Sequence, residues 1–215
     1  MRNEAQTIAV ALTGASGMPY GMRLVECLLG AGCRVWLLYS QVAQIVARQE
    51  MALNLPSRAA EVQAVLEARF SAGDGQLQVF GREEWFAPLA SGSNPADAMV
   101  VCPCTMGTLA AIAAGLSQNL IERAADVAIK EGRKLVLVPR ETPFSAIHLE
   151  NMLKLARLGV VILPPSPGFY THPQTVDDMV DFVVARVLDQ LRVPHRLMAR
   201  WGSARGHGAG GSGDG

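Results

Sequence analysis

Charged residues, aromatic residues and long apolar runs are all scarce in this sequence. Charged residues make up 18% of the 215 residues and aromatic residues 6%. Lys and Arg total 19 and Asp and Glu total 19, so the formal net charge is zero. Proteins that bind nucleic acid or anionic membranes in general carry a basic excess, which is missing here. No run approaches the ~20 apolar residues that a membrane-spanning helix needs. We therefore expect neither nucleic-acid binding nor a membrane span.

Cysteine is also sparse, and its spacing fits neither a CxxC pair nor a set of zinc ligands. The four cysteines are Cys27, Cys33, Cys102 and Cys104. The four histidines lie in the C-terminal third and show no metal-ligand spacing, so no metal is expected. The first apolar run, Thr7 to Thr13, is too short for a signal peptide. These features predict buried free thiols, a reducing compartment and a cytoplasmic location.

Hydrophobic residues, by contrast, make up 50% of the sequence, which excludes disorder, collagen and coiled coil. A chain of this length builds a core without disulfides or metal. No linker interrupts residues 1–201, which we assign to one domain. Residues 202–215 are rich in Gly and Ser and are predicted to form a flexible tail. The small charged share also indicates burial between subunits.

Short apolar runs alternate with longer amphipathic ones. The predicted strands are 7–13, 33–40, 76–80, 98–102, 134–139 and 160–163. The predicted helices are 20–29, 41–50, 58–70, 105–114, 119–131, 147–158 and a last helix that starts at a capping box of Thr175 and Asp178. Residues 88–95 are expected to be loop. The strands are continuously apolar, as strands buried on both faces are. This pattern predicts an α/β fold, with a Rossmann-like (flavodoxin-like), doubly wound parallel sheet between two helix layers.

Turn and hydroxyl residues follow the predicted strands at the sheet edge where such folds bind ligands. Gly14 to Gly17 is a glycine turn that opens a helix, and Thr105 to Thr108 combines hydroxyls and a glycine at a second helix start. Helix starts of this kind suit a phosphate, although neither a GxGxxG nor a Walker A motif is present. With Ser40 at the end of the second predicted strand, they indicate a mononucleotide or a similar phosphorylated cofactor.

Charged candidates lie on one helix and one loop. Arg123, Asp126 and Lys130 share a helix face, which is either functional or an ordinary solvated face with intrahelical ion pairs. Arg140 and Glu141 directly follow a buried strand, between two prolines, where loop charges are often functional. Converging cations bind a phosphate and stabilise its departure, and a carboxylate among them can act as a proton shuttle.

Arg186 lies at the edge of the apolar stripe of the last helix, about one turn beyond Phe182. It either reaches past that stripe into a pocket or is a snorkelling surface arginine. Trp85 and Trp201 are interpreted as packing residues from the sequence pattern alone.

Four segments of the sequence resemble the flavin prenyltransferases of the UbiX type, formerly described as aromatic-acid or octaprenyl-hydroxybenzoate decarboxylases. They are LTGASGMPYGMRL, CPCTMGTLAAIAAG, the long block from Asn119 to Tyr170, and VDDMVDFVVARVLDQL. The resemblance covers roughly residues 7 to 201, and the long middle block is very specific.

The resemblance implies particular site residues. FMN is expected at Gly14, Ala15, Ser16, Ser40, Thr105, Met106, Gly107, Thr108 and Arg140. The prenyl donor, dimethylallyl phosphate, is expected at Tyr170 and Arg186. Its phosphate pocket is expected to be completed by Arg123, Lys130, Arg140 and Glu141. Trp201 and Trp85 are expected to face the flavin and the prenyl group, and Glu50 matches a further pocket position. Met106 departs from the small or polar residue expected there, so a backbone contact is expected from it.

By the same resemblance, the reaction is a metal-independent prenyl transfer. The dimethylallyl group is joined to N5 and C6 of reduced FMN, and phosphate leaves. Glu141 and Ser16 are expected to handle protons, and Lys130, Arg123 and Trp201 to assist catalysis. The product, prenylated FMN, serves a decarboxylase of the UbiD type, which links the protein to ubiquinone biosynthesis. Family members form large homo-oligomers with sites between subunits, and a dodecamer is expected.

Three alternatives stay open. An FMN-dependent cysteine decarboxylase shares this fold, but its catalytic histidine is expected in the first half of the chain, and no histidine precedes His148 here. A non-catalytic flavin carrier needs the FMN turns but not the set of phosphate-binding cations. Direct decarboxylation of an aromatic acid needs a second site, which the sequence does not indicate.

Overall fold

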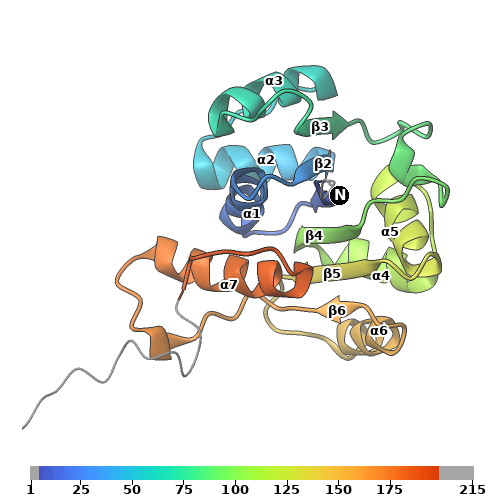
Figure 1. Cartoon of the computed structure of the whole chain (residues 1–215). Helices are drawn as coiled ribbons and strands as arrows, with labels where there is room; N and C mark the ends of the chain where they lie inside the picture. Colours follow the sequence, from blue (N-terminus) through green and yellow to red (C-terminus); the bar gives the residue numbers. More distant parts are fainter. Residues whose placement is uncertain (1–4, 199–215) are drawn as a thin grey trace, which may run out of the picture.

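The computed structural model describes residues 5–198, which form one parallel β-sheet between two layers of helices (Figure 1). The strands are β1 (Thr7–Leu12), β2 (Arg34–Tyr39), β3 (Leu77–Phe80), β4 (Ala98–Cys104), β5 (Lys134–Pro139) and β6 (Val161–Ile162). Their order in the six-stranded sheet is β3-β2-β1-β4-β5-β6, and every neighbouring pair is parallel. The parallel α/β sheet is as predicted; its strand order, which was not predicted, is the Rossmann order and differs from the flavodoxin order 2-1-3-4-5.

The helices divide between the two faces of the sheet. They are α1 (Met18–Gly30), α2 (Gln41–Met51), α3 (Ala59–Phe70), α4 (Met106–Ala114), α5 (Leu120–Lys130), α6 (Ala146–Arg157) and α7 (Val176–Leu191). Two short 3₁₀ turns, η1 (Pro88–Ala90) and η2 (Phe169–Thr171), complete the described part. Helices α1, α2, α3 and α7 share one core with the sheet, and α4, α5 and α6 share the other. The predicted element types are confirmed, except that the expected loop at 88–95 begins with η1.

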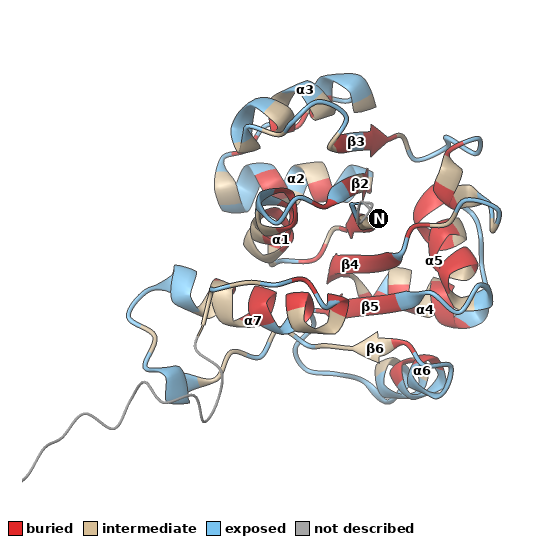
Figure 2. Cartoon of the chain, viewed as in Figure 1, coloured by how far each residue is buried: buried red, intermediate tan, exposed pale blue. Residues whose placement is uncertain are grey.

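Each strand supplies side chains to both cores, which explains the continuous apolar runs. In β1, Val10 and Leu12 pack with the α1 side, whereas Ala9 and Ala11 pack with the α5 side. All four are at most 1% exposed, and the central strands are buried over most of their length (Figure 2). Burial on both faces is typical of parallel sheets.

The order of the strands reverses between β1 and β4. The chain adds β2 and β3 on one side of β1, and then adds β4, β5 and β6 on the other side. Thr13, which follows β1, links the ends of β1 and β4. Its buried hydroxyl donates to the Pro103 carbonyl oxygen at 2.7 Å and accepts from the Thr105 amide at 2.8 Å. Ligands bind at such a reversal in open α/β sheets, at the carboxyl ends of the strands. The link fixes the two loops that flank this position.

The start of α7 is the capping box that the sequence predicts. The Asp178 amide donates to Thr175 Oγ1 at 3.1 Å, and the Thr175 amide donates to Asp178 Oδ2 at 2.9 Å. The backbone hydrogen bonds from Gln174 and Thr175 lower the pKa of the Asp178 carboxyl. The cap fixes where α7 begins.

Candidate active site

Three helix N-termini meet at the point where the strand order reverses, between β1 and β4. Helices α1, α2 and α4 follow the adjacent strands β1, β2 and β4. Ser40 caps α2 by accepting from the Ala43 amide at 3.2 Å, and Thr105 caps α4 by accepting from the Thr108 amide at 3.1 Å. Helix N-termini carry partial positive charge and first-turn amides. Their convergence fits a phosphate, which is the group expected here from the sequence.

The glycine turn after β1 packs directly against the first turn of α2. A Cβ atom added to Gly14 would lie 2.3 Å from Val42 Cγ1 and 2.5 Å from Val42 Cβ. No side chain fits at this position. Gly17 has a φ of 115°, which L-residues rarely adopt. The two glycines therefore keep the turn close to α2 and to the sheet edge.

Arg140 joins the loop after β5 to the turn after β1. Its Nε donates to the Ser16 carbonyl oxygen at 3.3 Å, across 124 residues of sequence. The next residue, Glu141, is exposed, and its carboxylate accepts from the Thr142 amide at 3.1 Å. The structure thus brings together the positions expected to bind the flavin. They are Gly14, Ala15, Ser16, Ser40, Thr105, Met106, Gly107, Thr108 and Arg140.

Glu50 also reaches this edge, from the last turn of α2. Its Oε2 accepts from the Gly17 amide at 3.0 Å and from the Met18 amide at 2.8 Å. Gly17 has no side chain with which to cap α1, and the first turn of α1 holds no acidic residue. Glu50 therefore caps α1 from another helix, which also places it beside the predicted flavin turn.

Tyr170 and Arg186 are the residues expected to bind the prenyl donor. Tyr170 contacts α7, and Arg186 lies on this helix. The ring of Tyr170 packs edge-on against Phe182, with 5.8 Å between ring centroids. Arg186 lies one turn further along α7 and is exposed. Its Nη1 donates to Asp189 Oδ2 at 2.6 Å.

Arg123 and Lys130 lie on α5, in the other helix layer. Arg123 Nε donates to the Ala90 carbonyl oxygen at 2.9 Å, and its Nη1 pairs with Asp126 at 2.9 Å. The intrahelical pair considered from the sequence is therefore present. Lys130 ends α5 just before β5 begins, whereas Arg140 follows the last residue of β5.

Lys130 and Arg140 lie too far apart in one chain to contact the same phosphate. Six strand residues of ~3.3 Å each put Lys130 about 20 Å from the sheet edge that holds Arg140. A single chain therefore does not gather the whole phosphate pocket expected from the sequence.

Three further predicted residues are placed differently. Met106 is 8% exposed and packs in the core on the α5 side, which leaves only its backbone for a ligand. Trp85 is 45% exposed on the loop after β3. Trp201 and the segment 202–215 lie outside the described residues.

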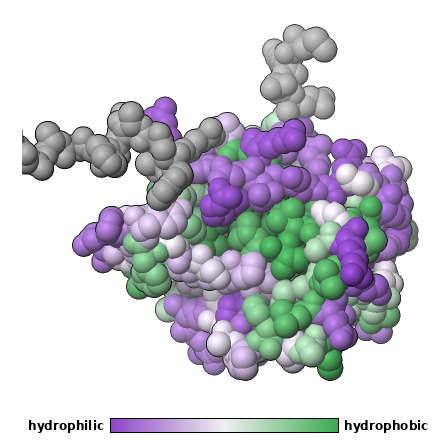
Figure 3. All heavy atoms as spheres, turned by 90° about the horizontal axis from the view of Figure 1, so that it is seen from below, coloured by the Kyte–Doolittle hydropathy of each residue, from purple (hydrophilic) through white to green (hydrophobic). Residues whose placement is uncertain are grey.

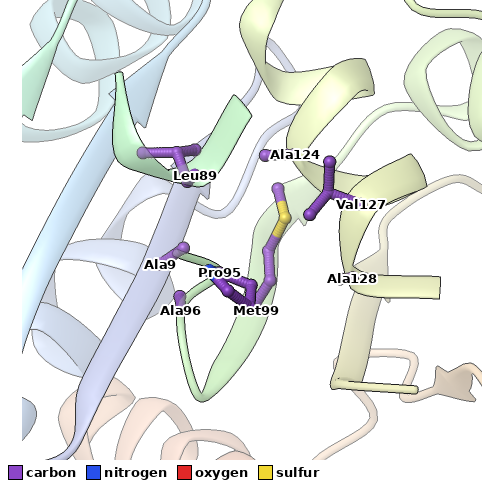
Figure 4. Close-up of a pocket in the computed structure, with 8 residues that line it drawn as sticks. All are labelled: Ala9, Leu89, Pro95, Ala96, Met99, Ala124, Val127 and Ala128. Carbon is purple, nitrogen blue, oxygen red and sulfur yellow. The ribbon is translucent and has the colours of Figure 1, made fainter. Parts of the chain in front are cut away.

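The described residues also line two cavities. One, of about 10 Å³, is lined by apolar residues of β1, β4, α5 and the η1 region (Figure 4). The Met99 side chain extends toward Ala124 and Val127 of α5 there. A cavity of this size and lining is a small packing gap. The other, of about 340 Å³, lies among α1, α3 and α7 and is lined by Arg23, Arg69 and Asp181, among others.

The described part of the chain contains no helix that is long and apolar enough to cross a membrane. Within residues 5–198, no three His, Cys, Asp or Glu side chains are grouped as metal ligands. All four cysteines are free; three are buried, and Cys27 is half-buried.

Comparison with known proteins identifies the family. The sequence profile of the Flavoprotein family matches residues 1–188. A Pseudomonas aeruginosa protein named flavin prenyltransferase UbiX is 55% identical over 197 residues, which is 92% of this chain and 94% of the relative. The chain belongs to the UbiX flavin prenyltransferase family. A protein from Methanocaldococcus jannaschii, also named flavin prenyltransferase UbiX, is 45% identical to this chain over 196 residues. The match covers 91% of this chain and 98% of the relative.

Solved structures of UbiX proteins share the fold. AnUbiX (PadA1), in complex with FMN and dimethylallyl pyrophosphate, is 38% identical, with a TM-score of 0.83 over 94% of this chain and 100% of that one. A dodecameric FMN-dependent UbiX-like decarboxylase from Escherichia coli O157:H7 is 45% identical, with a TM-score of 0.80 over 91% and 99% of the two chains. The cysteine decarboxylase TvaF reaches a TM-score of only 0.56 at 18% identity over 87% and 98%, which shows a shared fold alone.

Sequence reasoning did not single out three residues whose contacts the structure shows near the predicted positions. Thr13 was expected only as the end of a strand, yet it ties β1 to β4. Neither Asp189 nor His195 was singled out from the sequence. Asp189 lies three residues after Arg186, but i, i+3 pairs of this kind are common on helices and do not mark a site.

Proposed function

We propose that this UbiX-family chain transfers the dimethylallyl group of dimethylallyl phosphate to N5 and C6 of reduced FMN and releases phosphate. The observation that carries this proposal is the 55% identity to a flavin prenyltransferase over 92% of the chain. The geometry supports it, because the three helix N-termini and Arg140 meet at one edge of the sheet. We propose the same metal-independent reaction as expected from the sequence.

The chain's own residues fit FMN. We propose that Ser40, the Thr105–Thr108 segment and the N-termini of α2 and α4 hold its phosphate, because Ser40 and Thr105 cap helices that begin at the same edge of the sheet. The turn of Gly14, Ala15 and Ser16, kept close by Arg140, then lies beside the rest of the flavin. Bound FMN in its reduced form supplies the nucleophilic N5 and C6 atoms.

The donor is held by residues that a single chain keeps apart. We propose that Tyr170 and Arg186 bind dimethylallyl phosphate, and that Arg123 and Lys130 of a neighbouring subunit complete the phosphate pocket. Preorganised cations stabilise the departing phosphate. Trp85 and Trp201 are proposed to line the prenyl group, where an aromatic face stabilises allylic positive charge.

A homo-oligomer explains the apolar residues left exposed. Ile147, Leu149, Leu153 and Leu158 on and beside α6 are 51–68% exposed. The side on which α6, β6 and α7 lie carries large apolar areas between polar borders (Figure 3). Patches of this kind mark interaction surfaces. Because a similar protein from Escherichia coli is dodecameric, we propose a dodecamer here as well.

Proton transfer is assigned to the sheet edge. Glu141 is exposed beside Arg140 and is free to take a proton from the flavin or to pass one to phosphate. Ser16 lies in the turn after β1, where its carbonyl oxygen accepts from Arg140, and its hydroxyl is proposed to relay the proton. Glu50 is proposed to support both the turn and the pocket through its contacts with Gly17 and Met18.

The product, prenylated FMN, is proposed to serve a UbiD-type decarboxylase. A cytoplasmic location is proposed because the cysteines are free thiols. The competing functions are a flavin carrier and an FMN-dependent decarboxylase, for which the chain would bind FMN without prenylating it.

The test is anaerobic incubation with reduced FMN and either dimethylallyl monophosphate or pyrophosphate, followed by mass spectrometry of the released flavin. We expect a flavin heavier by one prenyl unit. Unmodified FMN, recovered from folded and flavin-loaded protein, would overturn the transferase. Cysteine-like and aromatic acids would then be supplied to test decarboxylation.

A further inference from the structure

We propose that Asp189 is a positioning residue that fixes the Arg186 guanidinium for the donor phosphate and is itself anchored by His195. The inference rests on the proposed function, which places Arg186 at the donor. Nothing in the sequence pattern marks Asp189 as part of the site.

The contact between the two residues is short but lies near the surface. Arg186 Nη1 is 2.6 Å from Asp189 Oδ2, one turn apart on α7. The Arg186 side chain is 51% exposed and that of Asp189 is 33% exposed. An isolated pair of this kind contributes little, because solvent competes and two flexible side chains lose rotamer freedom.

His195 makes this pair different. The chain turns back after α7 at Arg192, which has a φ of 58°, and brings His195 Nε2 to 3.1 Å from Asp189 Oδ1. The His195 side chain is only 11% exposed. A carboxylate only accepts hydrogen bonds, so Nε2 carries the proton. The Asp189 carboxylate is thereby held from both of its oxygens.

The imidazole depends on Asp189 in return. Its other ring nitrogen, Nδ1, is buried and has no hydrogen-bond partner among the described residues. Within residues 5–198, Asp189 thus provides the one polar contact of this ring. The contact fastens the segment after α7 to the helix face that carries Arg186.

Arg123, another helical cation of the proposed pocket, offers a comparison. Arg123 pairs with Asp126 at 2.9 Å with the same i, i+3 spacing. For Asp126, the described residues provide no second partner comparable to His195. Of these two arginines, only Arg186 is held by a carboxylate that has a second partner among the described residues.

The geometry has a consequence for binding. A guanidinium has five N–H donors, and the contact with Asp189 uses one of them. The remaining donors stay available to a phosphate, while the side chain keeps one orientation before the donor arrives. Such preorganisation reduces the side-chain conformational entropy that is lost when the donor binds. Loss of Asp189 is expected to weaken donor binding without altering the flavin turn.

The test uses steady-state kinetics of prenyl transfer by the full-length, FMN-loaded protein. Asp189→Asn keeps the side-chain volume but leaves one acceptor oxygen for two donors. We expect its KM for dimethylallyl monophosphate to rise about tenfold, as for loss of one charge-assisted contact, with kcat within about twofold. The affinity for FMN and the Tm should stay near those of the wild type. Glu61→Gln, which removes the carboxylate of the looser Arg58–Glu61 pair at 3.9 Å, is the matched control and should change nothing.

A double-mutant cycle separates positioning from a structural role. If Asp189 acts through Arg186, Asp189→Asn changes KM less than about twofold in an Arg186→Ala background. A full tenfold effect in that background would overturn the inference. So would an unchanged KM in the single variant, or an unchanged KM for Arg186→Ala in an enzyme that still prenylates FMN.

His195→Gln keeps the inference testable if Asp189→Asn does not fold. It should raise KM about threefold by freeing the carboxylate, and an unchanged KM would overturn the inference. Failure of the proposed function has a different signature, because the wild-type protein would then produce no prenylated flavin at all.

Discussion

Removing the Glu50 carboxylate should destabilise the protein at the glycine turn. Glu50 accepts from the amides of Gly17 and Met18 at 3.0 and 2.8 Å and caps α1 from the end of α2. Helix α1 has no side-chain cap of its own and no acidic residue in its first turn. Glu50→Ala therefore leaves two amides at the positive end of a 13-residue helix without their anionic partner.

The size of the effect follows from helix capping. Loss of an N-cap acceptor costs about 1 kcal/mol, and loss of a negative charge at a helix N-terminus costs roughly 0.3–1 kcal/mol more. Together they predict a loss of about 1–2 kcal/mol for Glu50→Ala. In a domain of this size, that lowers Tm by roughly 2–8 °C. Glu50→Gln keeps an acceptor oxygen and loses only the charge, so it should fall between Ala and wild type.

Thermal unfolding of the protein, with and without FMN, measures these shifts. Glu150→Ala, at an exposed position of α6, is the control and should leave Tm unchanged. The order Ala below Gln below wild type supports the capping contact. A Glu50→Ala protein that melts within about 1 °C of the wild type would refute it, because the stated loss requires more.

Three further perturbations have definite outcomes. Glu141→Gln should retain FMN but slow prenyl transfer by about 10²-fold or more, and near-normal turnover would remove Glu141 from proton transfer. Gly14→Ala should cost about 1–3 kcal/mol through its clash with Val42, measured by denaturant unfolding, and Val42→Gly should restore stability in the double variant. Burial raises the pKa of Cys27 to about 11 and of Cys102 to about 12, so thiolate is scarce at pH 8. Labelling with a disulfide reagent at pH 8 should therefore be slow until the protein is unfolded, and a fast stoichiometric thiol would contradict this.

The sequence predicts the fold well because its signals are local. Continuous apolar strands indicate two-faced burial, and a capping box such as Thr175 with Asp178 marks a helix start within four residues. The loops that follow the strands are also predictable, since parallel strands end at one edge. This is why Ser16 and Arg140 could be assigned to one site before their contact was known.

What the sequence did not predict depends on contacts between distant segments. Nothing near Glu50 shows that its carboxylate caps a helix 32 residues earlier. Asp189 has an ordinary helical spacing to Arg186, and only the turn after α7 brings His195 to it.

The charges on the two helices that supply the proposed donor pocket are balanced locally. Each proposed helical cation has an acidic neighbour, in the pairs Arg123–Asp126, Lys130–Glu131 and Arg186–Asp189. Seen from a distance, such a pair is a dipole, whose field decays faster than that of a free charge. With a formal net charge of zero, the protein also has no overall attraction for an anion. Electrostatic steering should therefore add little to the rate at which a phosphorylated donor arrives, and that rate should depend weakly on ionic strength. The cations act only once the phosphate is within contact distance.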